Sequence, residues 1–387
     1  MLLLEKIIEN LNSGMIFVAV FLVSVIISKL YECKIKKYTN DGDVIIRKVS
    51  RPFQFLAITA IIIGPVLLIG LRNQYVGADT YNNCMSYLNV GNINFTSGLL
   101  SLNDSRVLYY LLQEIIYLLF RDNYTIFLII IAFLTLYIFV LTITKWIDKI
   151  SLPLSLFLYY MFFGGILLDQ SRQMLAVSIV LYAYYIFEKG SRKKYLFIIC
   201  IAALIHFTAL VGILFYFIDF KKNRLINIKE YIFYFICLIS PIIAKPILTL
   251  IANLLPSKYA WYLTNLSFEG GYGWIINIIP ILIPIIILNK YYNNNYYNTF
   301  KRIIFLSFVF RIIGYYSFFL MRLYYYCAIL AVYMIPYGLN SIKSNSKKRI
   351  IKKGIILLYL SYFIINFLGF DAGQIFPYRT IFYMNVF

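Results

Sequence analysis

Long apolar runs separated by short polar segments repeat along almost the whole chain. Residues 124–144 and 231–250 are two such runs, and about 20 residues of helix are enough to cross roughly 30 Å of hydrocarbon. In lipid a spanning segment must satisfy its own backbone hydrogen bonds, as a helix does. The pattern therefore predicts an all-α polytopic membrane protein with about 10–12 transmembrane helices.

Ten of the runs are candidate spans: 15–30, 54–71, 124–144, 150–168, 174–188, 231–252, 274–289, 303–320, 324–339 and 355–370. Residues 1–12 are expected to form a short amphipathic lead-in to the first span. Residues 107–120 are short for a span, so an interfacial or re-entrant helix is expected there. Residues 195–218 have basic loops at both ends. A helical hairpin bent near His206 would keep both loops on one side, and a single crossing is the alternative.

The composition agrees with a membrane protein: 62% of the 387 residues are hydrophobic, 13% are charged, and the mean hydropathy is +0.79. A net charge of +20 could suit nucleic acid. However, most lysines and arginines lie in short loops, where they orient membrane helices, so no nucleic-acid partner is expected. The five cysteines lack metal-ligand or CxxC spacing. Cys84 is expected to be exposed on a loop and the other four to be buried thiols.

The loop charges set the expected orientation. With the N-terminus outside, 26 of the 36 lysines and arginines fall in inner loops and 8 in outer ones, as the positive-inside rule requires. The chain is then one integral membrane domain, 1–387. Its long outer loops are 72–123, which contains the interfacial helix, and 253–273. Frequent Ile, Lys, Asn and Tyr suggest a bacterial source.

Arginine dominates the outer basic residues, whereas the inner loops are rich in lysine. Lysine is sufficient for orientation, while the planar guanidinium suits bidentate binding of phosphate or carboxylate. We therefore take Arg72, Arg172 and Arg322 as candidate anion ligands, with contact to lipid headgroups as the alternative.

Two further polar residues stand beside or within apolar runs. Gln173 follows Arg172 where one span ends and the next begins, at an expected helix N-terminus that favours an anion. His206 is the only histidine. It could be a packing residue, but ionisable groups at membrane depth are functional candidates by default. Without a second histidine or cysteine nearby, a metal site is not expected.

The stretch "LRNQYVGADTY" (71–81) places one carboxylate, Asp79, on the same outer loop as Arg72. Gly77 between them would let the loop turn closely. Aromatic and acidic residues on outer segments could contact sugar rings, although an aromatic belt at the membrane surface is the alternative. These candidate sugar contacts are Tyr81, Tyr325, Trp261 and Glu269.

In these residues the chain resembles the EpsG family of bacterial exopolysaccharide and capsule polymerases, which are related in role to Wzy-type O-antigen polymerases. The resemblance lies, in order, in "RNQYVGADTY" (72–81), "RQMLAVSI" (172–179) and "HFTAL" (206–210). The later "MRLYYY" (321–326) and "IPYGL" (335–339) are consistent with it.

The resemblance implies a GT-C-like glycosyltransferase with an outer-face cavity in the bacterial cytoplasmic membrane. It would join oligosaccharide repeat units carried on undecaprenyl pyrophosphate, using no cofactor, metal or nucleotide sugar. Its partners would be membrane lipids, a flippase and a chain-length regulator. Asp79 would be the general base. The pyrophosphate ligands would be Arg72, Arg172, Gln173, His206 and Arg322.

Several alternatives stay open from the sequence. The family pattern implies an acidic residue shortly before 107–120, where Arg106 stands instead, so Asp104 or Glu114 could be that partner. A flippase for the same lipid-linked units would also need arginines, but usually with an internal repeat that is not evident here. A membrane acyltransferase of surface sugars would use a catalytic histidine, a role open to His206.

A hydrophilic tag inserted within residues 221–224 is expected to report the inner side, because a hairpin at 195–218 returns the chain to the side it left. Labelling of the tag with an impermeant reagent in intact cells checks this. Labelling from outside would show a single crossing instead.

Overall fold

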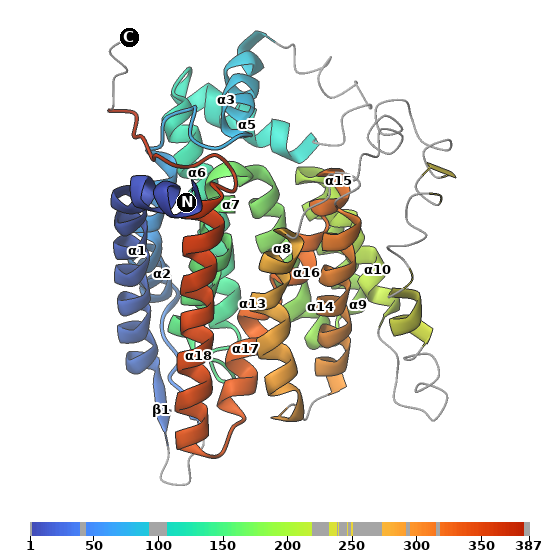
Figure 1. Cartoon of the computed structure of the whole chain (residues 1–387). Coiled ribbons are helices and arrows are strands. Elements are labelled where there is room, and N and C mark those ends of the chain that lie inside the picture. Colours follow the sequence, from blue (N-terminus) through green and yellow to red (C-terminus); the bar gives the residue numbers. More distant parts are fainter. Residues whose placement is uncertain are drawn as a thin grey trace.

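The computed structural model describes residues 2–38, 44–92, 107–218, 232–237, 273–291, 295–314 and 318–382, with the short pieces 239, 246 and 249–250. These residues form a bundle of helices with a short strand pair at one end (Figure 1). The N-terminal elements are α1 (Leu2–Ile35), β1 (Lys36–Tyr38), β2 (Val44–Ile46), α2 (Arg51–Gly70), α3 (Thr80–Leu88), η1 (Asn89–Asn92), α5 (Val107–Phe120) and α6 (Tyr124–Thr144). The central elements are α7 (Leu152–Asp169), α8 (Ser171–Glu188), α9 (Arg192–Ile205), η2 (Phe207–Leu210) and α10 (Val211–Phe217). The last are α13 (Gly273–Leu288), η3 (Asn289–Tyr291), α14 (Asn295–Ile313), α15 (Phe318–Met321), α16 (Tyr324–Ala328), α17 (Ala331–Asn340), α18 (Asn345–Phe363) and the π-helix η4 (Ile364–Gly369).

Within this part of the chain, five helices are long and apolar enough to cross a membrane. They are Leu3–Ile35, Arg51–Gly70, Tyr124–Thr144, Leu152–Asp169 and Asn345–Gly369. Shorter apolar helices accompany them at Val107–Phe120, Phe207–Phe217 and Ile275–Tyr291. Helices of this length and hydropathy can span the hydrocarbon core, because their backbone groups are bonded within the helix and their apolar side chains can face lipid. The all-α polytopic membrane class predicted from the sequence is therefore confirmed.

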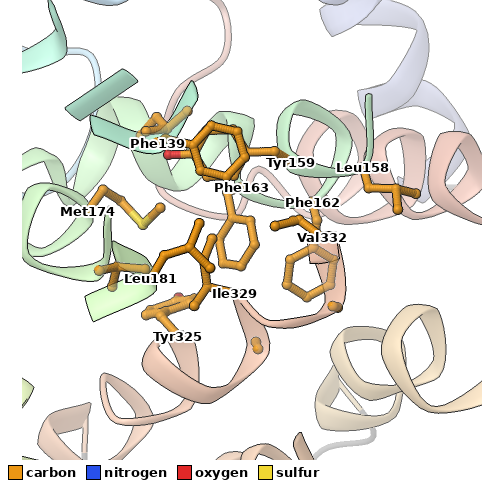
Figure 2. Packing of buried hydrophobic residues seen from close by; sticks show 14 of the residues in the cluster. Phe139, Leu158, Tyr159, Phe162, Phe163, Met174, Leu181, Tyr325, Ile329 and Val332 are labelled. Atoms are coloured by element: carbon orange, nitrogen blue, oxygen red, sulfur yellow. The ribbon is translucent and has the colours of Figure 1, made fainter. Parts of the chain in front are cut away.

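Helix α7 is the most deeply buried of the five, and it packs against α1, α6, α8, α17 and α18. Close packing depends on small residues: a Cβ on Gly165 would lie 2.2 Å from the ring of Phe367. Large rings fill the remaining space, for example Phe139 stacked on Tyr159 with centroids 3.6 Å apart (Figure 2). Because interiors packed this tightly resist displacement, α7 is a fixed element to which other segments attach.

The predicted bend near His206 is present. Helix α9 ends at Ile205, a 3-10 turn follows, and α10 runs back along α9. The Tyr195 hydroxyl donates to the carbonyl of Gly212 at 2.6 Å. A Cβ on Gly212 would lie 2.5 Å from Ile199, so the glycine is what allows the two arms to approach. Residues 195–218 therefore form a hairpin.

The structure corrects two element boundaries. Residues 1–12 are not a separate lead-in, because α1 is continuous from Leu2 to Ile35. The N-terminal part of α1 packs on Leu368. The Asn10 side chain donates to the carbonyl of Leu368 at 3.0 Å, and Gly14 lies against the Leu368 side chain. Residues 345–353, which lie between the candidate spans 324–339 and 355–370, form the start of α18, with Ser344 as its N-cap.

Other expectations meet the structure only in part. Cys84 is buried in α3 rather than exposed, because that short helix packs on α5 and α6. Burial raises the pKa of its thiol to about 11. Cys33 and Cys200, expected to be buried, are exposed. The predicted outer loop 253–273 lies outside the described residues except at its last position.

The far end of α8, away from α7, is held by a buried carboxylate. Glu188 accepts hydrogen bonds from the Trp146 indole and, at 2.6 Å, from Lys149. The Tyr333 hydroxyl donates to the same carboxylate at 3.4 Å. Glu188 thus joins the α6–α7 connection, α8 and α17 at the end of the bundle where Figure 1 shows β1.

Glu188→Ala is expected to lower the free energy of unfolding by about 2–3 kcal/mol, because it leaves buried donors without an acceptor. Thermal unfolding of the protein in detergent measures this. Glu188→Gln keeps an acceptor oxygen and should lose less. Asp148→Asn, at an exposed position in the same connection, is the control and should unfold like the parent.

Candidate active site

The connection between α7 and α8 is a single non-helical residue. Helix α7 ends at Asp169, Gln170 has φ −103° and ψ 51°, and α8 begins at Ser171. This sharp break places Arg172 and Gln173 on the first turn of α8, directly after the end of α7 at Asp169. The local sequence "LLDQSRQ" thus places one carboxylate, one guanidinium and two side-chain amides at the end of a buried helix.

The loop after α2 is fastened to the same place by a buried arginine. Arg72 is fully buried and donates through Nε to Thr80 Oγ1 at 3.3 Å and through Nη1 to the carbonyl of Ile69. Thr80 donates in turn to the carbonyl of Leu168 at 3.0 Å. Burial lowers the pKa of the Arg72 guanidinium. Arg72 therefore holds the loop against the end of α7.

A second segment, residues 371–382, closes over this loop. The amide of Gly77 donates to the carbonyl of Gln374 at 2.9 Å, and that of Ala78 to Gly373 at 3.0 Å. Asn73 donates to the carbonyl of Arg379 at 2.9 Å. The loop 71–79 is thus bonded on one side to α7 and on the other to 371–382. No local sequence pattern indicates this role of residues 371–382.

The two acidic residues of the site are adjacent but differently placed. The backbone amide of Asp79 donates to Asp169 Oδ1 at 2.8 Å. Asp79 precedes α3, yet its side chain makes no capping bond. Its carboxylate instead accepts from Arg322 Nη2 at 2.9 Å. Gln173 donates to the carbonyl of Arg322 at 2.6 Å, which holds that arginine over the start of α8.

His206 stands at the bend of the α9–α10 hairpin with one edge of its ring fixed. Its Nδ1 lies 2.6 Å from Thr208 Oγ1, which lies 3.0 Å from the Tyr326 hydroxyl. The Tyr326 hydroxyl is 3.4 Å from the same nitrogen. Tyr184 in α8 donates to the carbonyl of Tyr326 at 2.8 Å. The imidazole is thereby tied to α8 and α16.

These segments surround a cavity of about 180 Å³. Its lining residues are Asp79, Asn82, Asn83, Ser86, Gln170, Arg172, Gln173, His206 and Arg322. The guanidinium of Arg172 lies over the ring of Tyr109 in α5, 5.5 Å from its centroid. Two arginines, one carboxylate, four side-chain amides and one imidazole therefore face one space, a set suited to an anion beside sugar hydroxyls.

The family model of EpsG matches residues 55–380, which is most of the chain. The match includes all the described residues that line this cavity. The chain belongs to the EpsG family. Searches of curated proteins and of solved structures give no significant match. Membership of the EpsG family indicates a polysaccharide polymerase-like, glycosyltransferase-like function with a lipid-linked sugar substrate in a membrane.

The structure of this EpsG protein brings together five of the six residues predicted for catalysis and pyrophosphate binding. The predicted residues that line the cavity are Asp79, Arg172, Gln173, His206 and Arg322. Arg72 does not line it, because its side chain points beneath the loop to Thr80 and Ile69. Arg72 is thus placed to hold Asp79 in position.

The two predicted sugar contacts that the structure describes, Tyr81 and Tyr325, do not line the cavity. Tyr325 is 6% exposed and packs in the core near Phe163 (Figure 2). Tyr81 is 42% exposed and stacks on Tyr75 outside the cavity. Trp261 and Glu269 lie outside the described residues.

Sequence reasoning missed the amide wall formed by Asn82 and Asn83 together with Ser86 in α3. Ser86 donates to Gln113 of α5 at 3.3 Å. A short polar helix directly after Asp79 was the available signal. Among the described residues, no group of three or more His, Cys, Asp or Glu side chains could hold a metal ion.

Gly77→Ala is expected to destabilise the site, whereas Gly190→Ala should cost only the backbone strain. Both glycines have positive φ, 95° and 80°, a conformation that costs a non-glycine residue about 1 kcal/mol. A Cβ on Gly77 would also lie 3.0 Å from Asp169 Cα, while one on Gly190 would meet nothing within 4 Å. Thermal unfolding and amide hydrogen exchange over residues 73–83 compare them. Equal losses in the two variants would contradict the close packing at Asp169.

Proposed function

We propose that this EpsG protein joins lipid-linked oligosaccharide repeat units into a polysaccharide, by glycosyl transfer in this cavity at the outer membrane face. The growing chain on undecaprenyl pyrophosphate is the donor, and a hydroxyl of the incoming repeat unit is the acceptor. The observation that carries the proposal is the placement of Asp79, Arg172 and Arg322 on one cavity. These residues come from three separate parts of the chain, and together they supply a base and two cations.

The cations suit the leaving group. When the bond between the anomeric carbon and the phosphate oxygen breaks, its electron pair stays on the lipid pyrophosphate. Fixed cations stabilise such developing charge most strongly in a site away from bulk water. Arg172 is held on Tyr109, and the first turn of α8 adds a favourable dipole. In the proposed reaction the arginines, rather than a metal ion, stabilise the negative charge on the leaving pyrophosphate.

Asp79 is the proposed general base. Its carboxylate would take the proton of the acceptor hydroxyl as that oxygen bonds to the anomeric carbon. In the structure Arg322 pairs with Asp79, with side chains 29% and 38% exposed, and a partly exposed pair is weak. A pyrophosphate can therefore compete for Arg322 and leave Asp79 ready to accept a proton once the donor is bound.

His206 is proposed to contact the leaving pyrophosphate. Thr208 and Tyr326 hold its Nδ1 edge through their hydroxyl groups, which orients the ring. They act as positioning residues, since the tautomer of a histidine is set by the bond its other nitrogen makes.

Helix α5 supports the proposed placement at the membrane surface. Its exposed residues include Ile115, Leu118 and Leu119, whereas Tyr109 and Gln113 are buried. The helix thus has an apolar outer stripe and a face directed to the site. Such a helix fits at the interface between headgroups and acyl chains, near the pyrophosphate of a lipid carrier.

Purified protein reconstituted with the host's lipid-linked repeat units is expected to produce a ladder of longer glycans. Asp79→Asn should lower the rate by about 10²–10⁴-fold, the usual contribution of general base catalysis, and Arg172→Ala should also abolish the ladder. Gel analysis of labelled glycan measures both.

The matched control is Arg121→Ala, an exposed arginine outside the cavity, which should leave the ladder unchanged. Transport of labelled lipid-linked units across liposomes without chain growth would identify a flippase instead. Transfer of an acyl group to the sugar, dependent on His206, would identify an acyltransferase.

A further inference from the structure

A second hollow of about 460 Å³ lies between the 71–79 loop and residues 371–382. Its lining residues are Asn73, Tyr75, Val76, Gln374, Ile375, Phe376, Pro377 and Arg379. None of them lines the first cavity. Its volume falls within the range of about 300–1,000 Å³ typical of small-molecule sites. We call it the distal hollow.

Two stacked tyrosines, Tyr75 and Tyr81, stand on the segment that contributes residues to both spaces. Tyr75 lines the distal hollow, and Tyr81 precedes Asn82 of the first cavity. Their rings are 5.6 Å apart at an angle of 11°, and they are 65% and 42% exposed. Large exposed rings at a fixed place on a surface commonly mark a binding site.

The wall that links the two spaces is rigid. The amide of Tyr75 donates to the side chain of Asn73 at 3.1 Å, and Gly77 is bonded to residues 371–382 as described above. Residues 73–83 thus line the distal hollow at one end and the first cavity at the other. A ligand longer than one cavity could extend along this wall past the two rings.

The lining favours a sugar over other ligands. Aromatic rings offer flat apolar surfaces to the faces of a pyranose, and the amides of Asn73 and Gln374 can bond its hydroxyls. Among the described residues that line it, there is no carboxylate for a metal ion, and Arg379 is the one cation. It is therefore less suited to a pyrophosphate than the first cavity, which has two arginines and a histidine.

We propose that the distal hollow, with Tyr75 and Tyr81, binds an oligosaccharide several sugars away from the reacting bond. This inference rests on the proposed function, which places the reacting bond beside Asp79. The bound glycan is a repeat unit or the growing chain, so the hollow would set how strongly the enzyme holds it between transfers.

Tyr75→Ala is expected to weaken binding of the lipid-free oligosaccharide, released from the host's repeat unit by mild acid, by about tenfold. Saturation-transfer NMR on protein in detergent measures this. Tyr75→Phe keeps the ring and should bind like the parent. In the reconstituted reaction, Tyr75→Ala should raise the KM for the acceptor and shorten the products, while kcat for one transfer stays within about twofold.

Phe382→Ala is the matched control. Phe382 is an aromatic residue that is 76% exposed, and it belongs to the 371–382 segment but lies outside the hollow. Unchanged oligosaccharide binding in a folded Tyr75→Ala protein would overturn the inference, even if polymerisation itself is observed. Binding lost equally in Tyr75→Ala and Phe382→Ala would do the same. If the parent binds the oligosaccharide through Tyr75 but forms no polymer, the proposed reaction fails and the glycan site stands.

Discussion

The hydrogen bond from the Asp79 amide to the Asp169 carboxylate joins the two halves of the candidate site. Asp169 ends a helix that is buried along its length, so it cannot shift without disturbing the core. Asp79 is partly exposed and belongs to a connecting loop rather than to a spanning helix. The bond therefore transfers the rigidity of α7 to the loop, and the glycines at 77 and 373 allow the three backbones to meet there.

This hydrogen bond also brings the negatively charged side chains of Asp79 and Asp169 close together. Two carboxylates next to each other repel, and neighbouring cations and donors offset that repulsion. Arg322 pairs with Asp79, Gln170 donates to Asp169, and the buried Arg72 interacts electrostatically with Asp169. Of the three arginines expected to bind the substrate, Arg72 instead holds the loop through Thr80 and the carbonyl of Ile69. The arginines that face the cavity stand on α8 and before α16, on elements fixed by the core.

The helices and most cavity residues were predictable because their signals are local. Apolar runs long enough to span lipid can be recognised from the sequence alone. Arg172 and His206 are likewise recognisable there, because each stands next to apolar residues. The burial of Arg72 and the role of residues 371–382 could not be foreseen, because they depend on contacts between distant segments. The Tyr378 hydroxyl, for example, bonds the carbonyl of Leu68, 310 residues away. Local patterns carry no information on such pairings.

The attachment of residues 371–382 to the 71–79 loop has a consequence for biosynthesis. Helices of a membrane protein insert one after another as the ribosome moves along the message, and the loop reaches its final side early. Its closing hydrogen bonds must wait for a segment translated some 300 residues later. Until that segment arrives, the growing polypeptide lacks the hydrogen bonds from residues 371–382 that fix the loop carrying Asp79.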